Sequence, residues 1–501
     1  AIIAAFNEHG EGEKSILMFH RMQEANVGQD EYVYVLALNS CAMMSSLSLG
    51  KQIHAQILGN DAKSDVFVCN ALIDMYAKCG DFKGALIMFG KMPRRDLISW
   101  NAIIGACTRN DLNEKALCFF YNMQKEAFEP SPVTLVNVLK ACSALEFLDN
   151  GRVIHALVVE EGFEFGTIIG SALTNMYAKC GELADASCVL ERQPNRHIGI
   201  WNALITGYTQ HGSGEKALTL FQKMNNNGFM PNEVTFVCIL KACSSIKLTE
   251  KCQELHIDIM RKGFFEDDLL IGNAVVDAYG KCGLFAEAKD VFNRMPNRDV
   301  VSWNVLIWAY VELGDNAEVF EYYEQMQIEH LSPDVVTYSI ILRACGNIGC
   351  SEKGKVLHVE IAKKGLLDKE LVSKTLVEMY VKCGSIAEAQ EVFERLPLRD
   401  IVSWTSLITG YAQLGDCRSV CHTFHRMIMD GVVPNLITFF SVLNVCSHSG
   451  LIGTGESYFA DMVRNYNILP TLEHYTCMID LYSRAGQIDN AIAMTNEMPF
   501  S

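Results

Sequence analysis

The sequence predicts an all-α protein, a solenoid of about fifteen antiparallel helix hairpins. Three observations lead to this prediction. The hexapeptide MYAKCG at 75–80 returns at 176–181, and near copies stand at 278–283 and 379–384. The hexapeptides are 101 or 102 residues apart, and four tryptophans have the same spacing, at Trp100, Trp201, Trp303 and Trp404. Apolar residues between these marks follow helical spacing, and self-similarity at a fixed period is the mark of a repeat architecture.

Residues 66–96 show the unit that repeats. An apolar stripe that includes Met75 lies on one side of a first short helix. Gly80 is the expected stop of that helix, and Asp81 is a good N-cap for the next one. A second apolar stripe follows, and Pro93 ends it. One hairpin cannot bury both stripes alone, so it must stack on its neighbours.

Three hairpin types alternate along the whole chain. Their lengths are 35, 35 or 36, and 31 residues, which together give the observed period. Each hexapeptide is then the end of a first helix plus its turn in the shortest type. In chain order the predicted hairpins span 1–30 (incomplete), 31–65, 66–96, 97–131, 132–166, 167–197, 198–232, 233–268, 269–299, 300–334, 335–369, 370–400, 401–435, 436–471 and 472–501.

The composition is that of a globular protein. Of 501 residues, 50% are hydrophobic and 20% are charged. No run of 18 apolar residues occurs, so we expect no membrane-spanning helix and no membrane partner. Many of the 19 cysteines recur with the repeat and none forms a CxxC pair. We therefore expect packing thiols in a reducing compartment rather than a disulfide framework.

Three consecutive segments carry a family resemblance. The segment VVSWNVLIWAYVELGDNAEVFEYYEQMQIEHLSPD (300–334) resembles a pentatricopeptide repeat of the standard P type. The next two segments, 335–369 and 370–400, resemble the long L type and the short S type. This PLS order covers the whole chain, with L and S variants at 436–471 and 472–501. The resemblance implies a right-handed superhelical solenoid of tetratricopeptide-like hairpins.

The resemblance also implies single-stranded RNA as the ligand, with one base for each repeat. It places base recognition at the fifth and the last residue of a repeat. An amide or hydroxyl there can distinguish donors from acceptors on a base edge. In the P repeats these pairs are Asn101 with Ser131, Asn202 with Asn232, Asn304 with Asp334, and Thr405 with Asn435. In the S repeats they are Asn70 with Asp96, Ser171 with His197, Asn273 with Asp299, and Lys374 with Asp400.

The L repeats differ at the fifth residue. It is apolar in four of them, Val35, Val136, Val237 and Phe440, and Ser339 is the exception. We expect the L repeats to recognise bases weakly or to act as spacers. At the second residue the resemblance places side chains that stack on bases, namely Ile98, Val301 and Val402. Gly199 fills this place in 198–232 and has no side chain to stack.

Two simpler interpretations stay open. Asp and Asn at the repeat ends could be plain helix N-caps. The net charge of −17 opposes phosphate binding and leaves a protein-binding scaffold as the rival class. A cation recurs at one structural position, which in four repeats is the lysine of the hexapeptide, and it could form a phosphate-binding stripe or simply oppose the helix dipole. These cations are Lys78, Lys179, Lys281, Lys382 and Arg484.

Enzyme motifs are weak, so we expect no catalytic residue, no metal and no cofactor in this chain. HVE at 358–360 matches half of a zinc deaminase signature, but His358 belongs to a repeat-locked series and no CxxC follows. By resemblance, the chain would select a cytidine for C-to-U editing in a transcript of the mitochondrion or, alternatively, the chloroplast. A deaminase would lie beyond residue 501 or act in trans as a partner. Roles in RNA stability, processing or splicing are further alternatives.

Overall fold

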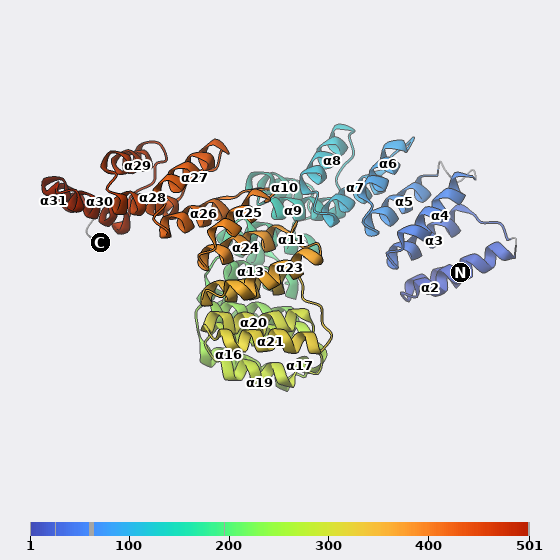
Figure 1. Ribbon diagram of the computed structural model, residues 1–501. Coiled ribbons are helices and arrows are strands. Elements are labelled where there is room, and N and C mark those ends of the chain that lie inside the picture. The colour runs from blue at the N-terminus through green and yellow to red at the C-terminus, as the bar shows by residue number, and fades with distance from the viewer. Residues whose placement is uncertain (1, 26, 60–64, 195, 499–501) are drawn as a thin grey trace. The chain divides into compact units, whose positions relative to one another are not determined.

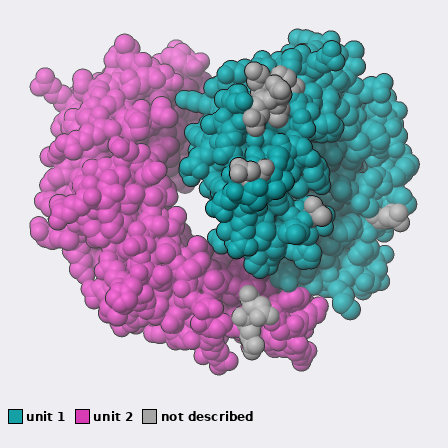
Figure 2. Space-filling model, turned by 90° about the vertical axis from the view of Figure 1, so that its right-hand side faces the viewer, with its two compact units in different colours: residues 1–246 teal, residues 247–501 magenta. Residues whose placement is uncertain are grey.

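The computed structural model describes residues 2–25, 27–59, 65–194 and 196–498. The two ends of the predicted array and the end of the predicted hairpin 31–65 therefore lie partly outside the described residues. The chain divides into two compact units, Ala1–Ile246 and Lys247–Ser501, which Figure 2 colours separately. Within the described residues every regular element is a helix (Figure 1).

The first unit is a succession of helix pairs. Its helices are α1 (Ile2–Glu8), α2 (Gly12–Glu24), α3 (Glu31–Met43), α4 (Leu47–Leu58), α5 (Val66–Lys78), α6 (Phe82–Lys91), α7 (Leu97–Arg109), α8 (Asn113–Lys125), α9 (Pro132–Leu145), α10 (Leu148–Glu160), α11 (Thr167–Lys179), α12 (Leu183–Arg192), α13 (Ile198–Gln210), α14 (Gly214–Asn226) and α15 (Glu233–Ser245).

The second unit continues the same alternation. Its helices are α16 (Thr249–Arg261), α17 (Phe264–Asp267), α18 (Leu269–Lys281), α19 (Phe285–Arg294), α20 (Val300–Leu313), α21 (Asn316–Ile328), α22 (Val335–Ile348), α23 (Ser351–Lys363), α24 (Glu370–Lys382), α25 (Ile386–Glu394), α26 (Ile401–Gln413), α27 (Cys417–Met429), α28 (Leu436–Ser449), α29 (Ile452–Arg464), α30 (Leu472–Arg484) and α31 (Ile488–Glu497).

Each unit has two layers of helices. The first helices of successive hairpins contact one another, as α5, α7 and α9 do in the first unit and α20, α22 and α24 do in the second. Within each unit, second helices pack on the first helix of their own hairpin and on that of the next, as α8 does on α7 and α9. The first helices therefore form one continuous layer inside each unit, and the second helices cover one side of it. The all-α solenoid predicted from the sequence is confirmed.

The hexapeptide has the local structure expected of a helix end and a turn. Helix α5 ends before Cys79, and Gly80 adopts a left-handed backbone with φ of 79°. Gly181, Gly283 and Gly384 have φ values of 85°, 79° and 72° at the same place. Asp81 then caps α6 by accepting a hydrogen bond from the Gly84 amide at 3.0 Å. A left-handed turn is far easier for glycine than for other residues, which explains why this position is glycine in every copy.

The variation between copies of the hexapeptide has a packing reason. The side chain of Met379 lies against Gly354 of α23, where a Cβ atom would come within 2.5 Å of the methionine sulfur. Gly50 with Met75 and Gly151 with Met176 repeat this close contact. In the remaining hexapeptide copy, AYGKCG, the small Ala278 replaces methionine and the larger Cys252 replaces glycine. Volume lost on one helix is thus matched by volume gained on its neighbour.

Repeat-locked histidines join one hairpin to the next. The Nδ1 atom of His358 in α23 lies 2.9 Å from the hydroxyl of Tyr380 in α24. The same bond recurs at 2.7 to 2.9 Å as His54 with Tyr76, His155 with Tyr177, and His256 with Tyr279. Burial lowers the pKa of His358 and of its three counterparts. These histidines are therefore neutral structural residues near pH 7.

The tryptophan series belongs to the core. Trp303 packs edge-on against Phe292 with ring centroids 4.8 Å apart, and Trp404 packs in the same way on Phe393 at 4.7 Å. All 19 cysteines are free thiols, as the sequence predicts. Burial raises the pKa of Cys41 to about 12, so its thiol is a packing group rather than a nucleophile. Among the helices that the structure describes, none is long and apolar enough to cross a bilayer.

Candidate nucleic-acid interface

The exposed side of the first helices carries a row of apolar side chains. We call this side the first-helix face and define it by the second, fifth and ninth residues of each predicted hairpin. The three predicted stacking residues Ile98, Val301 and Val402 are 55%, 52% and 48% exposed. Other second residues are exposed and apolar as well, namely Tyr32, Phe67, Val133, Ile168, Val234, Leu270, Val336, Leu371 and Ile437. Large apolar side chains kept in solvent at one structural position point to a binding surface.

The sequence interpretation missed most of this row, because it sought stacking residues in the P repeats alone. The signal was present in the sequence, since the second residue is also apolar in every L repeat and in every S repeat before 472–501. Only exposure distinguishes such a residue from a core residue, and exposure depends on how neighbouring hairpins pack.

The fifth residue lies beneath this row and contacts the last residue of the same hairpin. Asn304 is 6% exposed, and its Nδ2 donates to Oδ1 of Asp334 at 3.1 Å. Four more of the predicted pairs are joined directly. They are Asn70 with Asp96 at 3.3 Å, Asn101 with Ser131 at 3.1 Å, Asn202 with Asn232 at 3.1 Å, and Lys374 with Asp400 at 2.7 Å.

The last residue is at the same time the N-cap of the next helix. Oδ1 of Asp334 accepts from the backbone N–H of Thr337 at 2.8 Å and from its hydroxyl at 2.9 Å. The Thr337 hydroxyl also lies 2.7 Å from Oδ1 of Asn304, which fixes the orientation of that amide. The capping interpretation is therefore correct for this residue, and the contact with Asn304 is made in addition to the cap.

One terminal atom of the last residue is left without a partner. Within the described residues, Oδ2 of Asp96, Asp299 and Asp334 accepts no hydrogen bond, whereas each Oδ1 serves the cap. In Asn232 the Oδ1 atom has the same capping role, and the atom left over is the Nδ2 donor. The spare group is thus an acceptor in Asp and a donor in Asn, at one geometric position. Two bases can be distinguished by that difference.

The ionisation of Asp334 favours this acceptor role. Burial alone would raise the pKa of Asp334, but hydrogen bonds from Thr337 and Asn304 outweigh burial and hold the pKa below its ordinary value. At Asp96 too, burial would raise the pKa, and hydrogen bonds from Ser99 and Asn70 outweigh burial and lower it. Both carboxyls are therefore ionised at neutral pH and accept hydrogen bonds only.

Three predicted pairs are not joined in this way. Thr405 reaches Asn435 through Thr438, whose hydroxyl lies 2.9 Å from that of Thr405 and donates to Asn435 at 2.8 Å. The hydroxyl of Ser171 donates to the Thr167 carbonyl of its own helix, and His197 caps α13 through the Gly199 amide. These two side chains share no hydrogen bond within the described part of the chain.

The third case is Asn273 with Asp299. The Oδ1 atom of Asn273 is buried without a hydrogen-bond partner among the described residues. In the next helix Ser302 stands where a threonine follows the P repeats, and its hydroxyl donates to Asp299 at 2.9 Å. The Oδ1 atom of Asn70 is likewise buried without a partner, and there too a serine, Ser99, donates to the aspartate.

Lys374 changes the character of its own pair. Its ammonium group donates to Oδ2 of Asp400, while the Ser403 amide uses Oδ1. Burial alone would raise the pKa of Asp400, but the bonds from Lys374 and Ser403 together outweigh burial and lower the pKa. Both carboxylate oxygens are thus occupied, and this hairpin has no spare acceptor.

A cavity of about 410 Å³ opens on the first-helix face of the second unit. Asn304 and Asp334 line it together with Val301 and Val336, the second residues of two successive hairpins. Such an arrangement suits a flat base, because the polar pair can hydrogen-bond the edge of the base while the apolar side chains stack on its faces.

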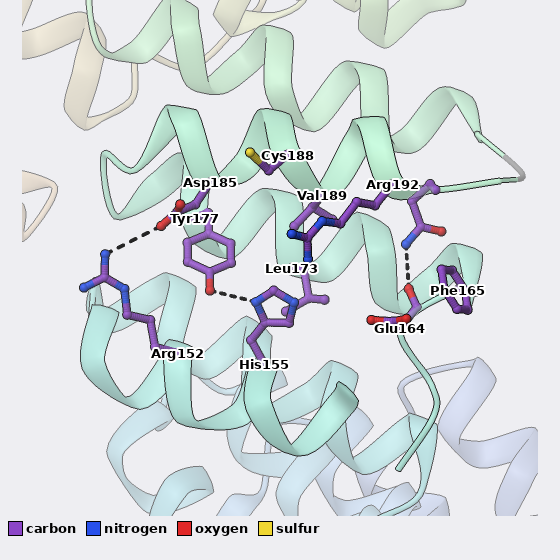
Figure 3. Close-up of a pocket in the computed structure, with 11 residues that line it drawn as sticks. Arg152, His155, Glu164, Phe165, Leu173, Tyr177, Asp185, Cys188, Val189 and Arg192 are labelled. Carbon is purple, nitrogen blue, oxygen red and sulfur yellow. Dashed lines mark hydrogen bonds and ion pairs between the residues drawn. The ribbon is translucent and has the colours of Figure 1, made fainter. Parts of the chain in front are cut away.

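A separate cavity of about 310 Å³ lies between α10, α11 and α12 (Figure 3). His155 and Tyr177 meet in it at 2.8 Å, and Arg152 lies 3.5 Å from Asp185. None of the predicted base-contacting residues lines it. Its histidine, tyrosine and Arg152 are held by contacts between neighbouring helices, so we assign it a structural role between hairpins.

The predicted stripe of cations is largely neutralised. Lys78, Lys281 and Arg484 form ion pairs with Asp74, Asp277 and Asp480 at 2.7 to 2.8 Å. Each of these aspartates stands four residues earlier on the same helix. Lys382 donates to the Asn347 side chain at 3.0 Å. Lys179 has no such partner within the described residues, so its proposed phosphate contact stays a prediction.

The HVE motif has structural contacts at both ends. His358 meets Tyr380, and Glu360 accepts from the Tyr338 hydroxyl at 2.6 Å. The described residues contain no group of three or more His, Cys, Asp or Glu side chains that could hold a metal ion.

The fold and this face define a helical-repeat protein with a modular binding surface, and comparison with known proteins gives its family. The PPR repeat family matches residues 196–245 and 298–347, and the pentatricopeptide repeat domain matches 398–449. The PPR repeat matches residues 1–27, 67–97, 98–128, 273–300, 336–366, 373–401 and 473–500.

Individual relatives agree with these matches. The chain is 33% identical over 500 residues to the pentatricopeptide repeat-containing protein At5g27110 of Arabidopsis thaliana, covering 100% of this chain and 72% of that protein. It is 33% identical over 520 residues to the mitochondrial relative At3g02330 of the same plant, with coverages of 100% and 57%. The chloroplastic relative At1g15510, also from Arabidopsis thaliana, is 32% identical over 500 residues, with coverages of 99% and 57%.

Among solved structures, the crystal structure of the pentatricopeptide repeat protein PPR10 from maize aligns with a TM-score of 0.62. The alignment covers 99% of this chain and 82% of that chain at 18% identity, so it shows a shared fold. The chain belongs to the pentatricopeptide repeat family.

Proposed function

We propose that this chain binds single-stranded RNA in a sequence-specific manner, with one base for each polar fifth and last residue pair. The observation that carries the proposal is the spare terminal atom of the last residue, held beside exposed apolar side chains at Asn304 and Asp334. PPR10 from maize, whose fold this chain shares, forms a complex with an 18-nt psaJ RNA element.

The proposed biological role is the selection of a cytidine for C-to-U editing in an organelle transcript. The PLS order of the repeats supports this finer role, and the names of relatives place such proteins in the mitochondrion or the chloroplast. The deaminase would be a further segment or a partner in trans. Stability, processing or splicing of organelle RNA would use the same binding face.

The pairings that the family resemblance implies give a target order. Uridine would face Asn70 with Asp96, and cytidine would face Asn101 with Ser131. A pyrimidine would face Asn202 with Asn232, and adenosine would face Thr405 with Asn435. Two consecutive uridines would face the adjacent pairs Asn273 with Asp299 and Asn304 with Asp334. The edited cytidine would follow about four nucleotides beyond the base that faces the last repeat.

The spare Oδ2 of Asp334 agrees with the uridine assignment. An ionised carboxylate needs a donor on the base, and the N3–H group of uridine is a donor where N3 of cytidine is an acceptor. At Asn232 the spare atom is a donor, which suits the N3 acceptor of cytidine.

The test replaces Asn304 with Thr and leaves Asp334 in place. The preference at that one base should move from uridine towards guanosine, and a wrong base should cost about 1–3 kcal/mol. The threonine fits the site, because Thr405 already occupies the same place in its own hairpin. Binding to RNAs varied at this base, measured by fluorescence anisotropy, gives the result.

Two results would contradict the proposal. Equal loss of affinity for all four bases would make Asn304 a structural residue. Retention of a peptide ligand by the unaltered chain, with no RNA binding at low salt, would favour the scaffold class instead.

A further inference from the structure

The L repeats carry cations that differ from the hexapeptide lysines in position and in ion pairing. The ninth residue of three L repeats is Lys140, Lys241 or Arg343, with the same step of 101 or 102 residues. All three are exposed, and within the described residues none forms an ion pair with a carboxylate. By contrast, Lys78 and Lys281 are held by aspartates on their own helices. Positive charge on the first helices is thus left uncompensated in the L repeats.

Geometry places Arg343 on the proposed RNA-binding surface. It lines the same cavity of about 410 Å³ as Asn304 and Asp334. Its guanidinium group lies 5.1 Å from the ring centroid of Trp308, the ninth residue of the preceding P repeat. Stacking uses the flat face of a guanidinium and leaves its N–H edge free, which suits the oxygens of a phosphate.

Helical spacing gives the two lysines the corresponding place. Lys140 and Lys241 stand four residues, about one helical turn, after Val136 and Val237, the fifth residues of their hairpins. Each cation therefore lies on the same side of its helix as the residue that would face a base. These two L repeats lack a polar fifth residue to recognise that base but keep a charge beside it.

We propose that the L repeats hold RNA by its backbone, with Lys140, Lys241 and Arg343 each contacting one phosphate. This proposal rests on the proposed function and assigns the L repeats a role other than spacing. It also explains how a chain of net charge −17 binds a polyanion, because the attraction arises from a few unpaired cations at fixed intervals. Recognition and anchoring would then alternate along the array.

The test compares two triple variants of equal charge. K140Q/K241Q/R343Q removes the proposed anchors. K125Q/K223Q/K363Q removes three exposed cations from the second helices α8, α14 and α23, which also lack ion pairs in the described structure. Affinity for the matched RNA is measured from 50 to about 300 mM salt, and circular dichroism confirms that both variants are folded.

The anchor variant should bind more weakly at every salt concentration. The slope of log affinity against log salt should become shallower by about 2, since each phosphate contact on a single strand contributes about 0.7. Its preference for uridine opposite Asn304 should be unchanged. The control variant should keep the original slope.

An unchanged slope in the anchor variant, with normal RNA binding by the unaltered chain, would overturn this proposal and leave the proposed function intact. An equal change of slope in both variants would also overturn it, because the effect would then be one of total charge. Absence of RNA binding by the unaltered chain would overturn both proposals.

Discussion

The Oδ1 atom of Asp334 accepts hydrogen bonds from the backbone of Thr337 and from the amide of Asn304. The capping and recognition interpretations looked like alternatives in the sequence, because each gives a reason for Asp at the end of a repeat. In the structure the cap uses Oδ1 and leaves Oδ2 without a hydrogen bond among the described residues. Under the proposed function, Oδ2 is the atom that would meet a base.

Lys374 offers a gain-of-function test of this arrangement. Replacing Lys374 with Asn should free Oδ2 of Asp400 and recreate the pair seen at Asn70 and Asp96. We expect a new preference for uridine at the base facing 370–400, worth about 1–3 kcal/mol over the other bases. Competition between RNAs that differ only at this base measures it.

The reciprocal change is the matched control. Asn70→Lys should fill Oδ2 of Asp96 in a hairpin of the same type and abolish the uridine preference there. If Lys374→Asn alters overall affinity but leaves all four bases equal, the spare oxygen is not what selects the base.

The four histidine–tyrosine bonds predict a loss of stability in acid. Burial lowers the pKa of His358 below its ordinary value of 6.5, so the unfolded chain binds this proton more readily than the folded chain. The stability that depends on neutral histidine is therefore fully present above about pH 6.5 and is lost as the pH falls below it. Thermal melting should show a lower Tm at pH 5 than at pH 8.

Substitution separates this cause from general acid effects. His358→Gln should reduce the difference between the two pH values, whereas His422→Gln, an exposed residue of α27, should leave it unchanged. Identical pH dependence in both variants would assign the acid effect to other groups.

At the scale of helices, close packing explains which residues accompany each other. Gly354 and Met379 form one tight contact, and Cys252 and Ala278 occupy the corresponding positions in another hairpin pair. This natural exchange of two residues suggests a double-mutant cycle. Gly354→Cys alone should cost about 1–3 kcal/mol through overpacking, and Met379→Ala alone about 2–5 kcal/mol through a cavity.

The double variant Gly354→Cys/Met379→Ala should lose less than the sum of the two single losses, by about 0.5–3 kcal/mol. Urea unfolding under reducing conditions, followed by circular dichroism, measures all four members of the cycle. Strict additivity of the two losses in unfolding free energy would mean that the sizes of the two residues are not coupled.

The sequence predicted helices and their ends well, because these depend on local signals. Gly80 and Asp81 mark a turn by their own chemistry, and the period of the hexapeptide shows the stacking. It could not predict that His358 bonds Tyr380, since that contact joins a second helix to the first helix of the next hairpin. For the same reason it did not show that the Oδ1 atom of Asn273 is buried without a hydrogen-bond partner among the described residues. Residue types at the site were predictable, but the atoms that meet depend on the neighbouring hairpin.

At the scale of the whole chain, the repeats are coupled mainly through adjacent helices. A local loss of packing should therefore stay local. In Gly354→Cys, amide hydrogen exchange should accelerate in α22, α23 and α24, while amides in α5 to α9 of the first unit keep their protection. Exchange detected by mass spectrometry resolves these segments.

Base preference should likewise change only near the altered hairpin. Opening of α22 loosens the cap that holds Asp334, so the uridine preference opposite Asn304 should weaken in Gly354→Cys. The cytidine preference opposite Asn101 and Ser131, in the first unit, should be retained. A uniform rise in exchange along the chain, with equal loss of discrimination at both bases, would show instead that the array folds and recognises RNA as one cooperative body.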